Sequence, residues 1–124
     1  MLRRDYIVLT KILEEISLSL RFMGNTTIEN FLSDELLKHA IGMAVINVGE
    51  LVKNLSNDLR MHYKNIPWKQ IAGFRDITAH KYETLDMEMV YYTVVDDFPT
   101  LKSNIELILE EKGVITSDND NLKR

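Results

Sequence analysis

The segment "RDITAHKY", residues 75–82, places an arginine, an aspartate, a histidine and a tyrosine within eight positions. Arginine offers phosphate oxygens a planar fork of permanently charged donors, and histidine gains or loses a proton near neutral pH. Such groups can cleave RNA without a metal ion: the ribose 2′-OH attacks, His80 serves as general base or acid, and Arg75 stabilises the charge developing at phosphorus. By spacing alone, however, a capped helix end is the more economical interpretation.

Helix geometry limits how these side chains can meet. Each residue of an α-helix turns by about 100°, so Arg75 and Tyr82 share a face while His80 lies roughly 140° from Arg75. The three side chains can meet only if the helix ends near Ala79 to His80, so a shared site predicts a helix end there. Since one histidine cannot easily serve as both base and acid, the chemistry also predicts a two-fold dimer that brings a second His80 to one cleft.

The remaining chemistry-bearing residues offer no competing site. His39 and His62 are expected at the surface, and the three histidines lack the H-x₃-H spacing of a helical metal site, so we predict no bound metal and no cofactor. The chain has no cysteine, which excludes disulfides and thiolate chemistry and is compatible with a cytoplasmic location.

Charge is distributed unevenly along the chain. The net charge of −4 argues against indiscriminate nucleic-acid binding, yet residues 53–82 hold six basic residues and two acidic ones. This basic segment either attracts a phosphate backbone or forms an ordinary solvated surface. Its basic members are Lys53, Arg60, Lys64, Lys69, Arg75 and Lys81.

Apolar periodicity predicts helices as the elements that position the motif. Residues 4–22 repeat apolar side chains at three- and four-residue steps, and a connector over residues 27–33 follows, with Phe31 and Leu32 as apolar contacts. Ser33 or Asp34 is expected to cap the next helix, whose broad apolar stripe covers residues 36–55. Within that stripe, small residues favour a close helix crossing or a subunit contact: Gly42, Ala44 and Gly49.

Two further helical segments are predicted in the second half. Pro67 suits the first turn of a helix, which we expect to reach about residue 79. The last helical segment starts near Asp86 and continues to Gly113, with Pro99 either kinking it or starting a new helix.

These elements predict an all-α fold, an up-and-down bundle of four to five helices in a single domain over residues 1–113, with a polar tail over 114–124. The N-terminal segment reads as an amphipathic helix because Lys11, Glu14 and Glu15 interrupt its apolar residues. No run of roughly 18 apolar residues occurs, so we expect no association with a membrane.

The segment "RDITAHKY" resembles the Arg-x₄-His-x-Tyr signature of HepT-like proteins, a branch of the HEPN superfamily of helical ribonucleases. The resemblance extends over nearly the whole chain apart from the tail. It is carried also by "RRDYIVLTKILEEI", "INVGELVKNL", "IPWKQIAGFRDITAHKY" and "VVDDFPTLKSNIELIL".

This resemblance implies a HEPN-like homodimer with facing ribonuclease motifs, in which Arg75 and His80 are catalytic. It also implies that Tyr82 accepts AMP from a cognate MntA-type nucleotidyltransferase, the antitoxin of a type VII toxin–antitoxin system. The modification would place a phosphate and a nucleoside beside Arg75 and block the RNA site. The dimer would act alone or in a larger complex with the antitoxin, and Lys69 and Lys81 would contact RNA or the antitoxin's acidic surface.

One residue departs from the family pattern. The position after the arginine is usually asparagine in this branch, whereas here it is Asp76. Its carboxylate would repel the scissile phosphate, but it could also orient His80 and favour the protonated imidazole. Three hypotheses therefore stay open: an endoribonuclease toxin, a weak or inactive helical dimer that binds or presents substrate to a nucleotidyltransferase, and a purely structural bundle.

Overall fold

The computed structural model describes residues 1–76 and 87–111, apart from the side chains of Arg75 and Asp76. Throughout these ranges the secondary structure is helical, which confirms the all-α class for this part of the chain. The bundle of four to five helices, the homodimer and the division into domain and tail stay predictions. Among the described helices, none is long and apolar enough to cross a membrane.

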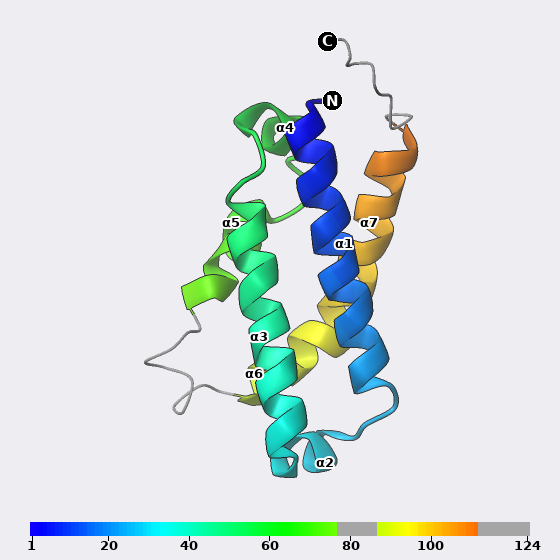
Figure 1. Ribbon diagram of the computed structural model, residues 1–124, viewed down its shortest axis with the longest axis vertical. Helices are drawn as coiled ribbons and strands as arrows, with labels where there is room; N and C mark the ends of the chain where they lie inside the picture. Colours follow the sequence, from blue (N-terminus) through cyan, green and yellow to red (C-terminus); the bar gives the residue numbers. More distant parts are fainter. Residues whose placement is uncertain (77–86, 112–124) are drawn as a thin grey trace.

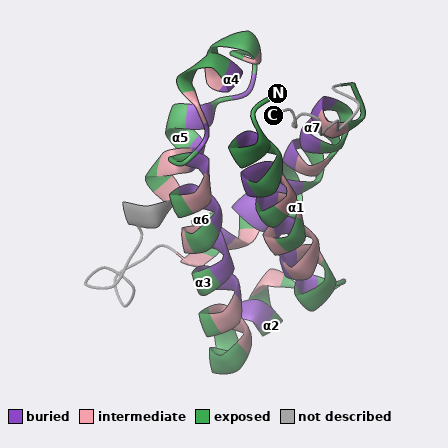
Figure 2. Cartoon of the chain, turned by 45° about the horizontal axis from the view of Figure 1, so that its top comes forward, coloured by how far each residue is buried: buried purple, intermediate pink, exposed green. Residues whose placement is uncertain are grey.

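Three long helices form the frame of the molecule. α1 (Arg3–Met23) lies between α3 (Glu35–Val52) and α7 (Phe98–Glu111), and it packs most extensively against α3 (Figure 1). Gly42, Ala44 and Gly49 of α3 are buried, and the close helix crossing or subunit contact expected from these small residues stays a prediction. Figure 2 shows the buried residues on the faces that the helices turn toward one another.

The core follows the predicted apolar periodicity. Side chains at three- and four-residue steps of each long helix are almost fully buried, and burying one such aliphatic side chain contributes about 1.5–3 kcal/mol. These core residues include Leu9, Ile12 and Ile16 of α1, Ile41, Val45, Val48 and Val52 of α3, and Leu101, Ile105 and Ile108 of α7.

Helix starts match the capping chemistry. The prediction of a cap at Ser33 or Asp34 is confirmed, because the Asp34 carboxylate accepts a hydrogen bond from the Leu37 N–H at 3.0 Å. The connector predicted over residues 27–33 is instead a short helix, α2 (Ile28–Ser33), capped by Thr27. Phe31 is fully buried there, as its role as an apolar contact requires.

The segment after α3 differs from the prediction. α3 ends at Val52, and a short helix that periodicity did not reveal, α4 (Asn57–His62), precedes α5 (Trp68–Ala72). Pro67 is the N-cap residue of α5. The expectation of a helix continuing to residue 79 is wrong as regards α-helix, since α5 ends at Ala72 and a 3₁₀-helix, η1 (Gly73–Asp76), follows.

The last helical segment has three parts: α6 (Met87–Tyr92), the π-helical segment η2 (Thr93–Asp97) and α7. Pro99 explains this irregularity, because it donates no backbone hydrogen bond and its ring clashes with the carbonyl one turn earlier. The wider π turn relieves that clash, and the chain then continues as a regular helix.

Candidate functional site

The predicted motif begins in η1. This 3₁₀-helix packs against α3 and follows α5 directly, and it carries the backbone of Arg75 and Asp76. Their side chains lie outside the described part of the structure, as do His80, Lys81 and Tyr82 entirely. The convergence of the motif side chains and the helix end near residues 79–80 therefore stay predictions.

Phe74 attaches η1 to the core. It is partly buried, and its ring centroid lies 6.5 Å from that of the fully buried Phe98 at the start of α7, with the ring planes at 46°. Aromatic pairs at such separations are attractive in tilted arrangements. Because Phe74 directly precedes Arg75, this contact fixes the backbone from which the motif arginine extends.

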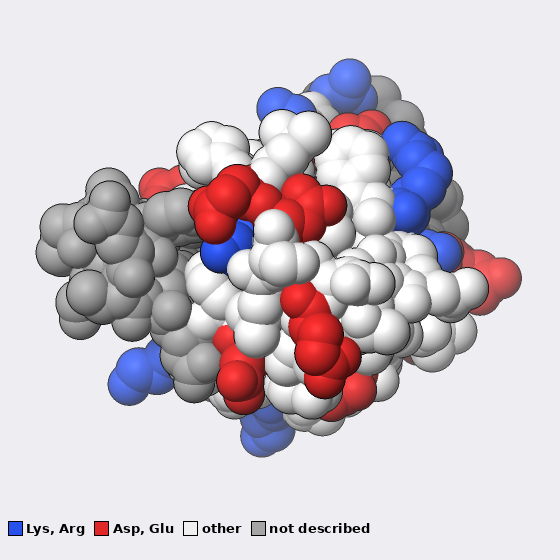
Figure 3. Space-filling model, turned by 90° about the horizontal axis from the view of Figure 1, so that it is seen from below, with Lys and Arg blue, Asp and Glu red and all other residues white. Residues whose placement is uncertain are grey.

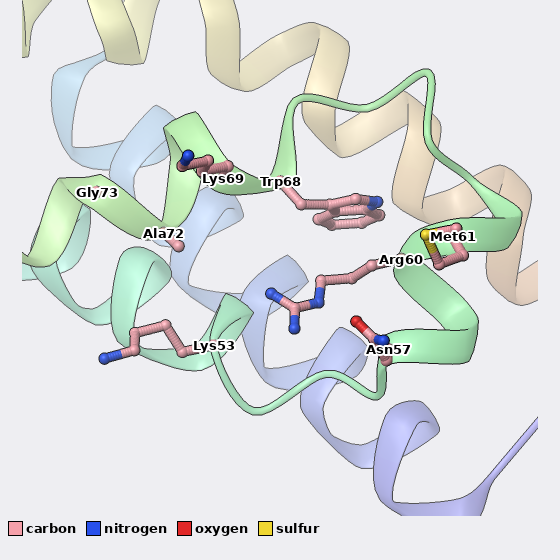
Figure 4. Close-up of a pocket in the computed structure, with 8 residues that line it drawn as sticks. All are labelled: Lys53, Asn57, Arg60, Met61, Trp68, Lys69, Ala72 and Gly73. Atoms are coloured by element: carbon pink, nitrogen blue, oxygen red, sulfur yellow. The ribbon is translucent and has the colours of Figure 1, made fainter.

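An open groove with a volume of about 570 Å³ lies next to η1 (Figure 4). We call it the basic groove, because the charged residues that line it within the described ranges are cationic. α3, α4, α5 and the start of η1 meet here. The groove is lined by Lys53, Asn57, Arg60, Met61, Trp68, Lys69, Ala72 and Gly73.

Arg60 occupies the middle of the basic groove. Its side chain runs alongside the Trp68 ring, and its guanidinium points toward the space between Lys53 and Ala72 (Figure 4). Among the described residues, its Nε is a buried donor with no hydrogen-bond partner. A buried unpaired donor costs about 1–3 kcal/mol. The guanidinium also carries terminal N–H donors of the kind that bind anions.

α4 presents Asn57 and Arg60 because its N-terminus is held from two sides. Ser56 is the N-cap, and its hydroxyl oxygen accepts a hydrogen bond from the Leu59 N–H at 3.1 Å. The buried carboxylate of Asp5 in α1 accepts hydrogen bonds from Ser56 as well. A short helix with little core of its own is thereby fixed to the long helix of the bundle.

The link between α4 and α5 is held by Trp68 and Tyr63. The Trp68 indole N–H donates to the Tyr63 carbonyl at 3.0 Å, so the ring that walls the basic groove has a fixed orientation. The Tyr63 hydroxyl donates to Glu111 Oε1 at 2.7 Å. Desolvation first, and then the hydrogen bond and negative charge of Glu111, raise the pKa of Tyr63 to about 12.

The basic groove is only partly foreseen by the sequence. Lys69, a predicted RNA or partner contact, lines it, and the basic segment that predicted a phosphate-attracting surface contributes Lys53 and Arg60 as well. Asn57 and Trp68 had not been recognised as site residues. Ser56 could have indicated part of the groove from the sequence, because it is a typical N-cap residue. It marks the start of α4, the helix that carries Asn57 and Arg60.

The other two histidines lie where the sequence predicted. His39 in α3 and His62 in α4 are both exposed, and neither lines the basic groove.

Comparison with known proteins identifies the family. The model of the HepT-like ribonuclease family matches residues 12–108, a range that contains the complete motif. The chain is 36% identical over 111 residues to the Methanocaldococcus jannaschii protein named "Gamma-glutamylcyclotransferase and putative RNase MJ0434", covering 89% of this chain but only 50% of that protein.

A second relative has nearly the same length as this chain. The "Probable ribonuclease HepT" of Thermococcus cleftensis is 35% identical over 103 residues, which cover 83% of this chain and 92% of that protein. No solved structure shows a significant match. The match to the family model, which spans most of the described helices, shows that the chain belongs to the HepT-like ribonuclease family.

Proposed function

We propose that the protein is a metal-independent endoribonuclease whose catalytic residues are Arg75 and His80. The observation that carries this proposal is the family match over residues 12–108, which includes the whole Arg-x₄-His-x-Tyr motif. The fold is compatible with it, because η1 places the Arg75 backbone beside a groove lined by cations.

The proposed reaction is an internal transfer at phosphorus. His80 removes the proton from a ribose 2′-OH, whose oxygen attacks the adjacent phosphorus while the bond to the 5′-oxygen breaks. His80 of the partner subunit donates a proton to that leaving oxygen, so the products are a cyclic phosphate end and a 5′-OH end. Arg75 binds the non-bridging oxygens, where negative charge increases in the transition state. Asp76 supports the protonated form of His80.

RNA cleavage by purified variants tests this proposal. His80→Ala is expected to lower kcat by roughly 10²- to 10⁴-fold, the usual contribution of a general acid–base group. Arg75→Ala is expected to lower kcat by roughly 10²- to 10³-fold, the usual contribution of a group that stabilises transition-state charge. His62→Ala is the matched control, since His62 is an exposed histidine outside the motif, and it should cleave at the wild-type rate. Wild-type cleavage by a folded His80→Ala variant would place the active site elsewhere.

We further propose that the protein is the toxin of a type VII toxin–antitoxin system, silenced at Tyr82. The Tyr82 oxygen would attack the α-phosphorus of ATP on a nucleotidyltransferase partner, releasing pyrophosphate and leaving AMP on the tyrosine. The added phosphate and nucleoside would then occupy the space in front of Arg75. This step requires no residue of the basic groove.

Intact mass spectrometry tests the modification. Incubation with the nucleotidyltransferase and ATP should add the mass of AMP to the wild type and to Tyr92→Phe, which removes an exposed tyrosine of α6, but not to Tyr82→Phe. Modified protein should lose RNA cleavage. AMP addition to Tyr82→Phe would assign the acceptor to another residue.

A second candidate function is supported by Asp76, which stands where the family usually has asparagine. In that alternative, the protein is a weakly active or inactive helical dimer that binds the nucleotidyltransferase or presents substrate to it. Modification of Tyr82 without any RNA cleavage by the unmodified wild type would favour this function. Recovery of cleavage by Asp76→Asn would identify the carboxylate as the cause.

A further inference from the structure

We propose that the basic groove binds a backbone phosphate of the RNA strand next to the one that is cleaved. The inference rests on the proposed ribonuclease function, and it assigns a substrate-binding role to residues outside the Arg-x₄-His-x-Tyr motif. The central residues are Lys53, Arg60 and Lys69, each from a different helix or helix end.

The charge of the lining is the first argument. Among the described residues, three cationic side chains and the Asn57 amide line the basic groove, and no carboxylate does. Within the described part of the chain, none of the three cations forms a salt bridge, whereas Lys38 and Lys102 pair with neighbouring glutamates. A bound anion would interact favourably with all three cations.

The second argument is the state of Arg60. Its side chain is partly buried against Trp68, so much of its conformational freedom is already lost before a ligand arrives (Figure 4). Its buried Nε has no acceptor within the described structure. A guanidinium with a fixed orientation and unused donors suits a phosphate group, which takes two parallel hydrogen bonds from it.

The location of the basic groove identifies the ligand as the substrate strand. Gly73 closes one side of the groove and begins η1, and Arg75 follows two residues later on the same 3₁₀-helix. Since a 3₁₀-helix rises by about 2 Å per residue, the two sites are close along the backbone. A strand whose scissile phosphate lies at Arg75 therefore has a neighbouring phosphate within reach of the groove.

Charge across the whole molecule supports this orientation. Figure 3 shows acidic side chains gathered at the end that carries α2, where Glu29, Asp34 and Glu35 are exposed. α4 and α5, which carry most of the basic groove, lie toward the other end (Figure 1). Three cations that line one groove, together with acidic side chains gathered at the opposite end of the described structure, would favour a polyanion at the groove.

The binding test uses an RNA that cannot react. A 2′-O-methyl oligonucleotide lacks the nucleophile, so its affinity can be measured by fluorescence anisotropy with the full-length protein. Lys53→Gln and Lys69→Gln should each weaken binding by roughly three- to tenfold at low salt, to a similar extent for all sequences. Each lost contact should also reduce the slope of log affinity against log salt concentration by about 0.7.

Matched variants separate contact from general charge. Lys11→Gln removes an exposed lysine of α1 outside the basic groove, so its affinity should stay near that of the wild type. Arg60→Gln should weaken binding more than either lysine variant, while Arg60→Lys should restore only part of the affinity, because an ammonium cannot bind bidentately. Near-ultraviolet circular dichroism verifies that each variant keeps its packing around Trp68.

A minimal substrate distinguishes this proposal from the ribonuclease proposal. A dinucleoside monophosphate, which has only the scissile phosphate, serves as the reference substrate. In Lys53→Gln and Lys69→Gln, kcat/KM for a longer RNA should fall relative to kcat/KM for this reference substrate. Groove variants that bind and cleave long RNA like the wild type would overturn the groove proposal and leave the ribonuclease intact. Groove-dependent binding without any wild-type cleavage would overturn the ribonuclease instead. If the groove variants bind RNA like the wild type but no longer bind the nucleotidyltransferase, the groove is a protein-docking surface and the groove proposal is overturned.

Discussion

The carboxylate of Asp5 accepts two hydrogen bonds from Ser56: one from its backbone N–H at 2.8 Å and one from its hydroxyl at 2.6 Å. Asp5 lies in the first turn of α1 and is only 2% exposed, and Ser56 is the N-cap of α4. The contact joins residues 51 positions apart in the sequence. It fixes the helix that carries Arg60 to the frame of the bundle.

We predict that Asp5→Ala lowers the free energy of unfolding by about 2–4 kcal/mol, because the substitution leaves two donors of Ser56 without their acceptor in a buried setting. Denaturant unfolding measures this loss. Glu14→Ala, which removes an exposed carboxylate from the same helix, should change stability by no more than about 0.5 kcal/mol. Equal effects of the two substitutions would show that the Asp5–Ser56 contact does not stabilise the fold.

The same contact predicts that substitutions at Asp5 and Ser56 are not additive. Ser56→Ala removes both the N-cap acceptor and one of the two donors to Asp5, which should cost about 1–3 kcal/mol. In a double-mutant cycle with Asp5→Ala, the coupling energy should fall within about 0.5–3 kcal/mol, since the two residues interact directly. A coupling energy of zero would contradict a direct interaction in solution.

The hydroxyl of Tyr63 should titrate well above an ordinary tyrosine. The pKa of Tyr63 is about 12 in the folded protein against 10.0 for the free side chain. The folded state therefore holds this proton more tightly, and the corresponding stability is complete below pH 10 and lost as the pH rises toward 12. Tyrosinate absorbance of the wild type, compared with Tyr63→Phe, isolates this group.

A substitution at Glu111 separates the causes of that shift. Glu111→Gln removes the negative charge and weakens the hydrogen bond, so the pKa of Tyr63 should fall. It should stay above 10.0, because desolvation, the largest cause, remains. If the absorbance that disappears in Tyr63→Phe titrates near the ordinary pKa of tyrosine, the hydrogen bond between Tyr63 and Glu111 does not persist in solution.

Two glycines should respond differently to alanine. Gly24 ends α1 with a φ of +50°, a backbone conformation that a side chain disfavours, so Gly24→Ala should cost about 1–3 kcal/mol. Gly73 has a φ of −67°, and a Cβ there would meet nothing within 4 Å, so Gly73→Ala should be neutral or slightly stabilising. Thermal unfolding of the two variants measures this difference directly. A larger loss for Gly73→Ala would mean that the start of η1 needs backbone freedom.

Apolar periodicity predicted the helices that are long enough for the spacing of their apolar residues to repeat. The span predicted for the first helix, residues 4–22, agrees closely with α1, and the cap at Asp34 is confirmed. α2 and α4 contain six residues each, less than two turns, so neither produces a recognisable repeat. The sequence did not predict the end of α5 at Ala72 either. A 3₁₀-helix with different hydrogen bonds follows directly through Asp76, and its sequence pattern resembles a continued α-helix.

The sequence predicted the candidate site only in part. The residue types identified Arg75 and His80 as suited to phosphate chemistry, the family resemblance added Tyr82, and composition identified an excess of basic residues around them. Neither reveals that Arg60 lies beside Trp68, because that proximity depends on a connection held by the Trp68–Tyr63 hydrogen bond and on the attachment of α4 to α1. The groove is a property of tertiary packing among segments whose individual patterns are unremarkable.

Phe74 should act as a positioning residue for the proposed active site. Its ring packs against Phe98, and the next residue is Arg75, so Phe74→Ala should let η1 shift relative to the core. Displacements of about 1 Å can lower catalytic rates by roughly 10²-fold, so we expect kcat for RNA cleavage to fall by up to that factor while KM changes little. Steady-state kinetics measures both constants, and Phe74→Leu should recover much of kcat by refilling the contact.

Phe22→Ala is the matched control, because it removes an exposed phenylalanine from α1 and should leave both constants at the wild-type level. Loss of stability must be separated from loss of positioning, since truncating a partly buried aromatic ring also destabilises the fold, here by about 1–3 kcal/mol. Kinetics are therefore measured well below the unfolding temperature of each variant. A folded Phe74→Ala variant with wild-type kcat would show that the Phe74–Phe98 contact does not hold Arg75 in place for catalysis.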